Sequence, residues 1–371
     1  MAKRLPVTVI TGFLGAGKTT VLRHLLTRGG QRLAVMVNEF GSVGLDGDLI
    51  RSCGFCPEEE VDGRLVELNN GCLCCTVQDD FLPTMETLLE RADQLDGIVV
   101  ETSGLALPRP LLQALDWPAI RSRVHVNGVV TLVDGEALAA GSPVADAEAL
   151  ERQRAEDPSL DHLTAIDDLF EDQLQAADLV LISRADCMDA SAMAEMQGRI
   201  KDKVRPGTAL LPVSQGQVET SVVLGLDHKP TPQEAHHDHD HDHDHHNHDH
   251  HDHSHVDMVG SNVRVEGAFD RRALEQLLPS LVSNHQVVRL KGRVWLPSKT
   301  LPLQIQMVGP RLNSWFEAAP SHAWRPDQGC GADLVVLALN EAAAPALESG
   351  LQRLVQATPA KASPAAATPE S

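Results

Sequence analysis

The segment GFLGAGKT, residues 12–19, carries the clearest chemical signal in the chain because it has the spacing G-x-x-x-x-G-K-[ST]. Glycines in such a loop let backbone N–H groups turn inward around phosphates, and the N-terminus of a following helix adds positive potential. Lys18 would then reach the β- and γ-phosphates, and the Thr19 hydroxyl would bind Mg²⁺. The candidate phosphate-binding residues are Gly12, Gly15, Ala16, Gly17, Lys18, Thr19 and Thr20. The alternative is a chance glycine turn before a helix, and the strand-like run in front of the motif argues against it.

A carboxylate follows a second apolar run, in VVETSG at residues 99–104. Glu101 ends a predicted buried strand, so it can face a metal ion and phosphates at the carboxyl edge of a parallel sheet. Gly104 leaves room for a γ-phosphate. Lys18, Thr19 and Glu101 are therefore candidate catalytic residues, and Thr19 and Glu101 are candidate Mg²⁺ ligands. The alternative interpretation of Glu101 is a solvated acid at the end of a strand.

The segment SRAD, residues 183–186, stands where guanine-binding domains have N-K-x-D. Asp186 would accept two hydrogen bonds from the guanine edge, and the stem of Arg184 would lie over the ring. Adenine has no matching pair of donors, so such a site favours GTP over ATP. Ser183 replaces the usual asparagine, which leaves the strictness of this preference open. The segment PVS, residues 212–214, is placed like the loop that closes over the base.

Five of the seven cysteines fall within residues 53–75. C-x-x-C can form one side of a tetrahedral thiolate site, and the outer cysteines of C-x-C face the same side of an extended chain. Metal ligation is the interpretation that we favour, while a redox pair and plain buried thiols remain alternatives. The candidate metal ligands are Cys53 and Cys56 in C-x-x-C, and Cys72, Cys74 and Cys75 in C-x-C-C.

Twelve of the eighteen histidines gather with six aspartates in residues 236–255. The segment has no apolar residue, so we expect it to be disordered without metal and to act as an auxiliary metal site. Its histidines are His236, His237, His239, His241, His243, His245, His246, His248, His250, His251, His253 and His255.

The composition excludes some classes of protein. The chain has 371 residues and a formal charge of −21, which argues against a nucleic-acid partner because such a protein needs a basic face. No apolar run is long enough for a membrane span, and the basic N-terminus lacks the features of a signal peptide. We therefore expect a cytoplasmic protein whose cysteines are thiols or metal ligands.

Short apolar runs alternate with helical patterns through the first 215 residues, which predicts an α/β fold with a doubly wound, mostly parallel sheet. The expected strands are residues 7–11, 33–40, 97–104, 126–134, 178–186 and 208–214. We predict four parts: a nucleotide domain at 1–215, a linker with the histidine tract at 216–255, a smaller α+β domain at 256–340, and a disordered Ala/Pro-rich tail at 341–371.

With these motifs in one order, the sequence resembles the CobW family of P-loop GTPases, which act as metallochaperones. The resemblance rests on residues 12–19, the C-x-C-C at 72–75, the E-x-x-G at 101–104, and LKGRVWL at 290–296. It implies GTP, Mg²⁺ and a divalent metal as ligands. Within the family, residues 52–86 look most like the members that make cobalamin. This implies Co²⁺ as the metal and a cobaltochelatase as the recipient.

The resemblance also assigns a role to NEFGSVGLD, residues 38–46, as a nucleotide-sensing switch. Glu39 and Asp46 are the candidates there for contacts with Mg²⁺ or water, and so join the candidate catalytic residues. Residue types alone favour Zn²⁺ over Co²⁺, because thiolates suit zinc. A zinc chaperone of the same fold is one alternative function, and a non-enzymatic histidine-rich metal store is another. A kinase is a weaker alternative because no phosphoacceptor pocket can be recognised.

Overall fold

The computed structural model describes residues 4–28, 30–37, 65–67, 81–144, 166–225 and 258–357, with Asp146, Glu148, Leu150 and Glu151 between them. It divides into two compact units, one built mainly from residues before 258 and the other mainly from residues 258–357. Each unit is described by itself below.

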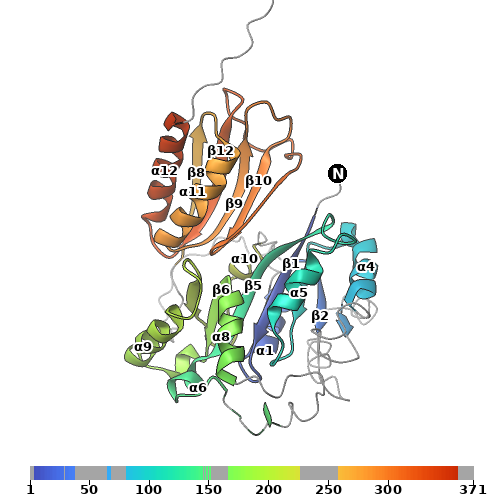
Figure 1. Ribbon diagram of the computed structural model, residues 1–371, viewed down its shortest axis with the longest axis vertical. Coiled ribbons are helices and arrows are strands. Elements are labelled where there is room, and N and C mark those ends of the chain that lie inside the picture. The colour runs from blue at the N-terminus through green and yellow to red at the C-terminus, as the bar shows by residue number, and fades with distance from the viewer. Residues whose placement is uncertain are drawn as a thin grey trace, which may run out of the picture. The chain divides into compact units, whose positions relative to one another are not determined.

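The first unit is built on a seven-stranded sheet in the order β3-β2-β4-β1-β5-β6-β7 (Figure 1). All of its ladders are parallel. Because β1 lies in the middle of the sheet, the loop that follows it opens at the centre of the carboxyl edge. The strands are β1 (Leu5–Gly12), β2 (Leu33–Val37), β3 (Leu65–Glu67), β4 (Gly97–Glu101), β5 (Val124–Asp134), β6 (Leu179–Ser183) and β7 (Ala209–Pro212).

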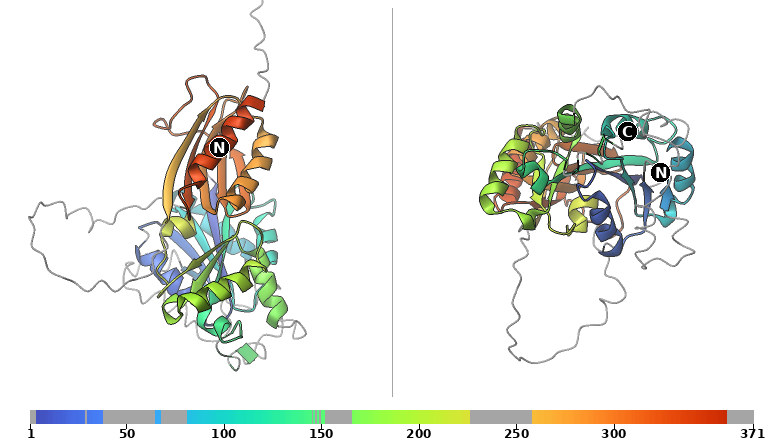
Figure 2. Two further views of the ribbon diagram at one scale, coloured as in Figure 1. Left: turned by 90° about the vertical axis from the view of Figure 1, so that its left-hand side faces the viewer. Right: turned by 90° about the horizontal axis from the view of Figure 1, so that it is seen from below.

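Helices cover both faces of this sheet, which is why β1, β2, β4 and β6 are buried along their whole length. Figure 2 shows α1 on one side of the sheet and α5 on the other. The predicted doubly wound parallel sheet is confirmed. The helices are α1 (Lys18–Arg28), α4 (Leu82–Glu90), α5 (Pro108–Leu115), α6 (Gly135–Ala139), α8 (Ile166–Ala176), α9 (Ala190–Lys201) and α10 (Thr220–Leu224).

The predicted boundary at residue 215 is too early. Helix α10 follows it, and its Thr220, Val222, Val223 and Leu224 are buried. The Leu224 carbonyl accepts a hydrogen bond of 2.8 Å from the buried Asn127 side chain of β5. These contacts make residues 216–225 part of the first unit and not part of a linker.

The second unit is an antiparallel α+β domain with the sheet order β11-β10-β9-β12-β8. Two helices, α11 and α12, pack on one face of the sheet and share a core with it (Figures 1 and 2). The predicted α+β domain is confirmed. Its elements are β8 (Val259–Glu266), α11 (Arg271–Asn284), β9 (Val287–Trp295), β10 (Leu303–Val308), β11 (Arg311–Phe316), β12 (Gly331–Ala338) and α12 (Ala343–Ala357).

Helix α12 corrects the prediction that the chain from residue 341 is a disordered tail. Its Ala343, Leu347, Gly350 and Leu351 are buried in the core of the second unit. The segment is rich in alanine, which favours a helix, and its few leucines recur at helical spacing on one face. Residues 358–371 lie outside the described part of the chain.

Among the described helices, none combines the length and the apolar character that a membrane crossing requires.

Candidate functional site

The phosphate loop joins the end of β1 to the start of α1, with the strand and the helix placed on the two sides that its motif requires. Gly12, Gly15 and Gly17 all have positive φ values, of 138°, 78° and 94°. A Cβ on Gly12 would lie 2.3 Å from the Leu132 carbonyl oxygen of β5. All three glycines therefore suit the backbone conformation of the loop, and Gly12 is also needed for the close approach to β5.

Lys18 is 8% exposed and is held inside this loop. Its Nζ donates hydrogen bonds to the carbonyl oxygens of Gly12 at 2.8 Å and of Phe13 at 3.1 Å. Phe13 anchors the loop to α8, because it is buried and its ring centre lies 5.9 Å from that of Phe170 in this helix. The lysine ammonium is thus poised at the loop where phosphate oxygens would become its partners.

Glu101 lies at the carboxyl end of β4, beside Ile10 of β1 in the sheet register, and is 2% exposed. The next residue, Thr102, donates from its backbone nitrogen to the Ile10 carbonyl at 2.9 Å and from its hydroxyl to that of Thr11 at 2.9 Å. These two hydrogen bonds hold Thr102 against the end of β1, next to the phosphate loop. A Cβ on Gly104 would then come 2.6 Å from the backbone nitrogen of Leu14.

The base-reading candidates lie beside the same loop. Gly17 lies close to Ser183, because a Cβ added to the glycine would be 3.6 Å from the Ser183 Cβ. The Ser183 hydroxyl donates a hydrogen bond to the Val133 carbonyl. Ser183 thus fills a packed position next to the phosphate loop. Asp186 is exposed on the short helix Ala185–Cys187.

Arg184 adopts a left-handed conformation with φ of 56°. Its Nη1 lies 3.0 Å from the buried Asp134 carboxylate and 3.3 Å from that of Glu136. Asp134 also accepts a hydrogen bond from the Ala137 backbone nitrogen, which caps α6. The sequence analysis missed this pairing because Asp134 ends one strand and Arg184 follows another, about fifty residues later. The guanidinium therefore has two carboxylate partners within the protein.

The loop after β7 completes the group of segments. The Val213 carbonyl accepts from the Ala185 backbone nitrogen at 3.3 Å, and a Cβ on Gly216 would lie 2.8 Å from the Thr20 side chain. The structure thus brings the phosphate loop, the E-x-x-G loop, SRAD and PVS to one edge of the sheet.

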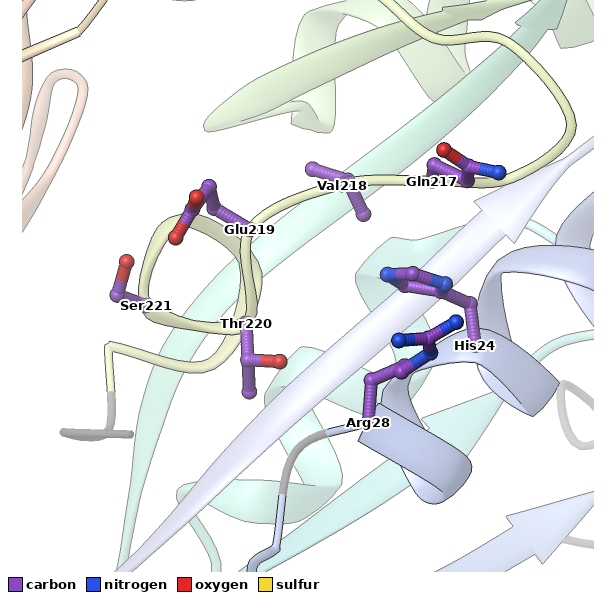
Figure 3. A pocket seen from close by; sticks show the side chains of 7 residues that line it. All are labelled: His24, Arg28, Gln217, Val218, Glu219, Thr220 and Ser221. Atoms are coloured by element: carbon purple, nitrogen blue, oxygen red, sulfur yellow. The ribbon is translucent and has the colours of Figure 1, made fainter. Parts of the chain in front are cut away.

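A cavity of about 350 Å³ lies between α1 and the segment that follows the loop after β7. It is lined by His24, Arg28 and residues 217–221. Figure 3 shows the side chains of His24 and Arg28 on the side of α1 that faces this segment. Burial lowers the pKa of His24, and the positive charge of Arg28 lowers it further, while a hydrogen bond with the Val218 backbone acts in the opposite direction. His24 therefore lies beside residues 217–221 in surroundings that disfavour its charged form.

The predicted metal ligands cannot be compared with the structure. Cys53, Cys56, Cys72, Cys74 and Cys75 lie outside the described residues, as do Glu39, Asp46 and the twelve histidines of residues 236–255. Within the described ranges, no group of three or more His, Cys, Asp or Glu side chains could hold a metal ion. Cys187 and Cys330 are free thiols in different units.

A parallel sheet whose central strand leads into a phosphate loop, with a buried acid at the neighbouring strand end, defines a P-loop nucleotide-binding protein. Residues 6–211 match the family described as "CobW/HypB/UreG, nucleotide-binding domain", and residues 258–355 match "Cobalamin synthesis protein cobW C-terminal domain". The chain belongs to the CobW/HypB/UreG family of P-loop GTPases.

Two relatives cover most of the chain. The zinc chaperone CobW of Pseudomonas aeruginosa is 46% identical over 344 residues, which are 90% of this chain and 87% of that protein. The zinc chaperone CobW of Sinorhizobium sp. is 40% identical over 359 residues, with coverage of 95% and 98%. The crystal structure of the Zn(II)-bound YjiA GTPase from E. coli aligns with 19% identity and a TM-score of 0.39, over 95% of this chain and 99% of that one. This last similarity is too weak to support an argument.

Proposed function

We propose that this protein is a GTP-dependent metallochaperone that carries Zn²⁺ to a recipient protein. The observation that carries the proposal is the joining of a phosphate loop to the E-x-x-G loop, through the contact between Gly104 and Leu14. A loop that touches the phosphate loop responds to the presence of a third phosphate, and such a response can be coupled to the capture and release of a metal ion.

In this proposal the phosphate loop binds the triphosphate, with Lys18 exchanging the carbonyls of Gly12 and Phe13 for phosphate oxygens. Thr19 and Glu101 offer a hydroxyl and a carboxylate, which are the oxygen donors that Mg²⁺ prefers. Bound Mg²⁺ would neutralise charge on the β- and γ-phosphates. Asp186 reads the base, and Val213–Gly216 closes beside it.

The cargo metal binds the cysteines of C-x-C-C, with those of C-x-x-C as further ligands. The cysteines lie in the chain between β2 and α4, and Val37 at the end of β2 is beside Glu101 in the sheet register. GTP favours metal capture and hydrolysis favours release. Linkage then requires that the metal tighten GTP binding by the same factor by which GTP tightens metal binding. The histidine tract serves as a local reservoir that raises the metal concentration near the cysteines.

Zinc is the cargo that we favour, because two relatives that cover at least 90% of the chain are named zinc chaperones and because thiolates suit Zn²⁺. Cobalt remains the second candidate. It rests on the resemblance of residues 52–86 to cobalamin-making members, and the description of the C-terminal domain family points the same way. Delivery to a cobaltochelatase stays a prediction that belongs to this second candidate.

The test measures GTP affinity and the GTP hydrolysis rate with Zn²⁺, with Co²⁺ and with no added metal, at one free Mg²⁺ concentration. We expect Zn²⁺ to tighten GTP binding at the lowest free metal concentration. A stronger effect of Co²⁺ at equal free concentration would support the cobalt role. A GTP affinity that neither metal changes would contradict a chaperone cycle and favour a simple metal store.

A further inference from the structure

Gln173 is a fully buried glutamine on α8 that none of the nucleotide motifs contains. Its Nε2 donates to the carbonyl oxygens of Gly104 at 3.2 Å and of Ala106 at 3.3 Å. Both bonds end on the loop that follows Glu101, so one side chain fastens this loop to a helix about seventy residues further along the chain.

The orientation of the amide follows from its surroundings. Two carbonyl oxygens face it, and only the –NH₂ group can donate to them, so the reverse orientation would place three acceptors together. The backbone carbonyl of Gln173 in turn accepts a hydrogen bond of 3.2 Å from the Thr131 hydroxyl of β5. The glutamine is therefore fixed at its backbone by the sheet and at its side chain by the loop.

Helix α8 also contacts the other half of the phosphate site. Phe170, one turn before Gln173, packs against Phe13 of the phosphate loop, and Leu105 of the E-x-x-G loop is buried in the same cluster. The helix is thus the common support of both loops. Among these contacts, the Gln173 amide supplies directional bonds to the segment that contacts the phosphate loop at Leu14.

We propose that Gln173 is a positioning residue. It holds the Gly104 loop in the position where the loop would contact a γ-phosphate, and so sets the preference of the site for GTP over GDP. The inference rests on the proposed function, because it assumes that GTP is the ligand. A diphosphate lacks the phosphate that this proposal places at the Gly104 loop, so GDP binding should not depend on how that loop is held. Fixing the loop in advance lowers the cost of ordering it when the triphosphate binds.

The first test replaces the amide with an apolar side chain of similar length, Gln173→Met. We expect GTP affinity to fall by about tenfold or more, as for the loss of one or two hydrogen bonds, while GDP affinity changes less than about threefold. The readout is the ratio of the two affinities, because a general loss of structure would weaken both nucleotides alike.

Gln175 offers a matched control on the same helix. Its Nε2 donates to the Lys203 carbonyl at 2.6 Å, in a contact between α8 and the turn after α9 that does not involve either loop. Gln175→Met removes a comparable hydrogen bond, and we expect the ratio of GTP to GDP affinity to stay within about twofold of that of the unchanged protein. An equal loss of preference in both variants would overturn the assignment to Gln173.

A second measurement needs no variant and applies even if Gln173→Met does not fold. Amide hydrogen exchange of the unchanged protein is compared with GDP and with a non-hydrolysable GTP analogue. We expect residues 102–107 and α8 to gain protection together with the analogue and not with GDP. Protection of the loop without any change in α8 would overturn the proposal.

The failure of this inference can be distinguished from the failure of the proposed function. If the unchanged protein binds GTP and GDP equally or not at all, the GTP-dependent cycle itself is wrong. If the unchanged protein prefers GTP and Gln173→Met retains the full preference, only the role of Gln173 is wrong.

Discussion

A Cβ atom on Gly104 would lie 2.6 Å from the backbone nitrogen of Leu14, so the E-x-x-G loop meets the phosphate loop with no room for a side chain. Backbone, and not a flexible side chain, forms the opposing surface. The two loops therefore approach each other through their main chains.

This contact predicts that Gly104→Ala separates the two loops. Overpacking of this kind costs about 1–3 kcal/mol, and if this cost falls on the nucleotide-bound arrangement we expect GTP affinity to fall roughly fivefold or more. Gly198→Ala is the matched control, because Gly198 lies inside α9 and a Cβ there would meet nothing within 4 Å. The control should raise stability by about 0.5–1 kcal/mol, since alanine is the better helix former. Equal GTP affinity in both variants would refute the role of the contact.

Lys18 is predicted to act on phosphate. In Lys18→Ala the buried Gly12 and Phe13 carbonyls lose their donor, so we also expect a loss of folding stability of about 1–3 kcal/mol. We expect GTP turnover by the folded variant to fall by about 10²-fold or more, as when the negative charge that develops in a transition state loses a stabilising donor. Lys201→Ala on the exposed end of α9 serves as the control. Normal turnover in a folded Lys18→Ala protein would exclude this assignment.

Asp186 is predicted to read the base. Asp186→Asn replaces an acceptor with a group that can donate, so we expect binding to shift from guanine toward xanthine nucleotides. Competition between GDP and xanthosine diphosphate measures the shift. Asp202→Asn, which changes an exposed carboxylate at the end of α9, should leave the preference as it was. If Asp186→Asn kept full guanine preference, SRAD would not be the base-reading motif.

The cysteine site is best tested with Co²⁺ as a spectroscopic substitute for the cargo. With Mg-GTP present, we expect thiolate-to-cobalt charge transfer and the visible bands of a tetrahedral ion. Cys72→Ser or Cys74→Ser should remove both signals, while Cys187→Ser, at an exposed thiol outside the motifs, should keep them. Unchanged spectra in both motif variants would move the site toward Cys53 and Cys56.

His24 predicts a pH dependence of stability. Burial and Arg28 lower its pKa in the folded protein, whereas the unfolded chain protonates near the ordinary value of 6.5. The unfolded state then binds more protons, so the contribution of neutral His24 is complete above pH 6.5 and declines as the pH falls through the lowered folded value.

Urea unfolding of the unchanged protein and of His24→Gln between pH 5 and pH 8 tests this sign. We expect the stability difference between the two to shrink as the pH is lowered. Arg28→Gln removes a neighbouring positive charge and should reduce the pH-dependent part of this difference. Parallel stability curves for the unchanged protein and His24→Gln would contradict the prediction.

Much of the first unit could be predicted from the sequence. Strands such as β1 and β6 are buried on both faces, so each appears in the sequence as a short apolar run. Such a run can be recognised without knowing which strands lie beside it. The phosphate loop is likewise a local motif, because its glycines are required by the backbone of the loop itself. The order of the motifs, from residue 12 to residue 186, was enough to indicate a P-loop GTPase.

Other features depended on contacts between distant parts of the chain. Strand β11 has only half-buried residues, so its sequence lacks an apolar run, and α12 becomes part of the core only because the sheet of the second unit buries its leucines. Arg184 and Gln173 show the same limit at the site. No sequence pattern indicates the partner of either side chain. In the structure Arg184 pairs with Asp134, and Gln173 donates a hydrogen bond to the Gly104 carbonyl. A local sequence determines backbone shape and burial, whereas the pairing of single buried polar groups is decided only when the sheet brings their strands and helices together.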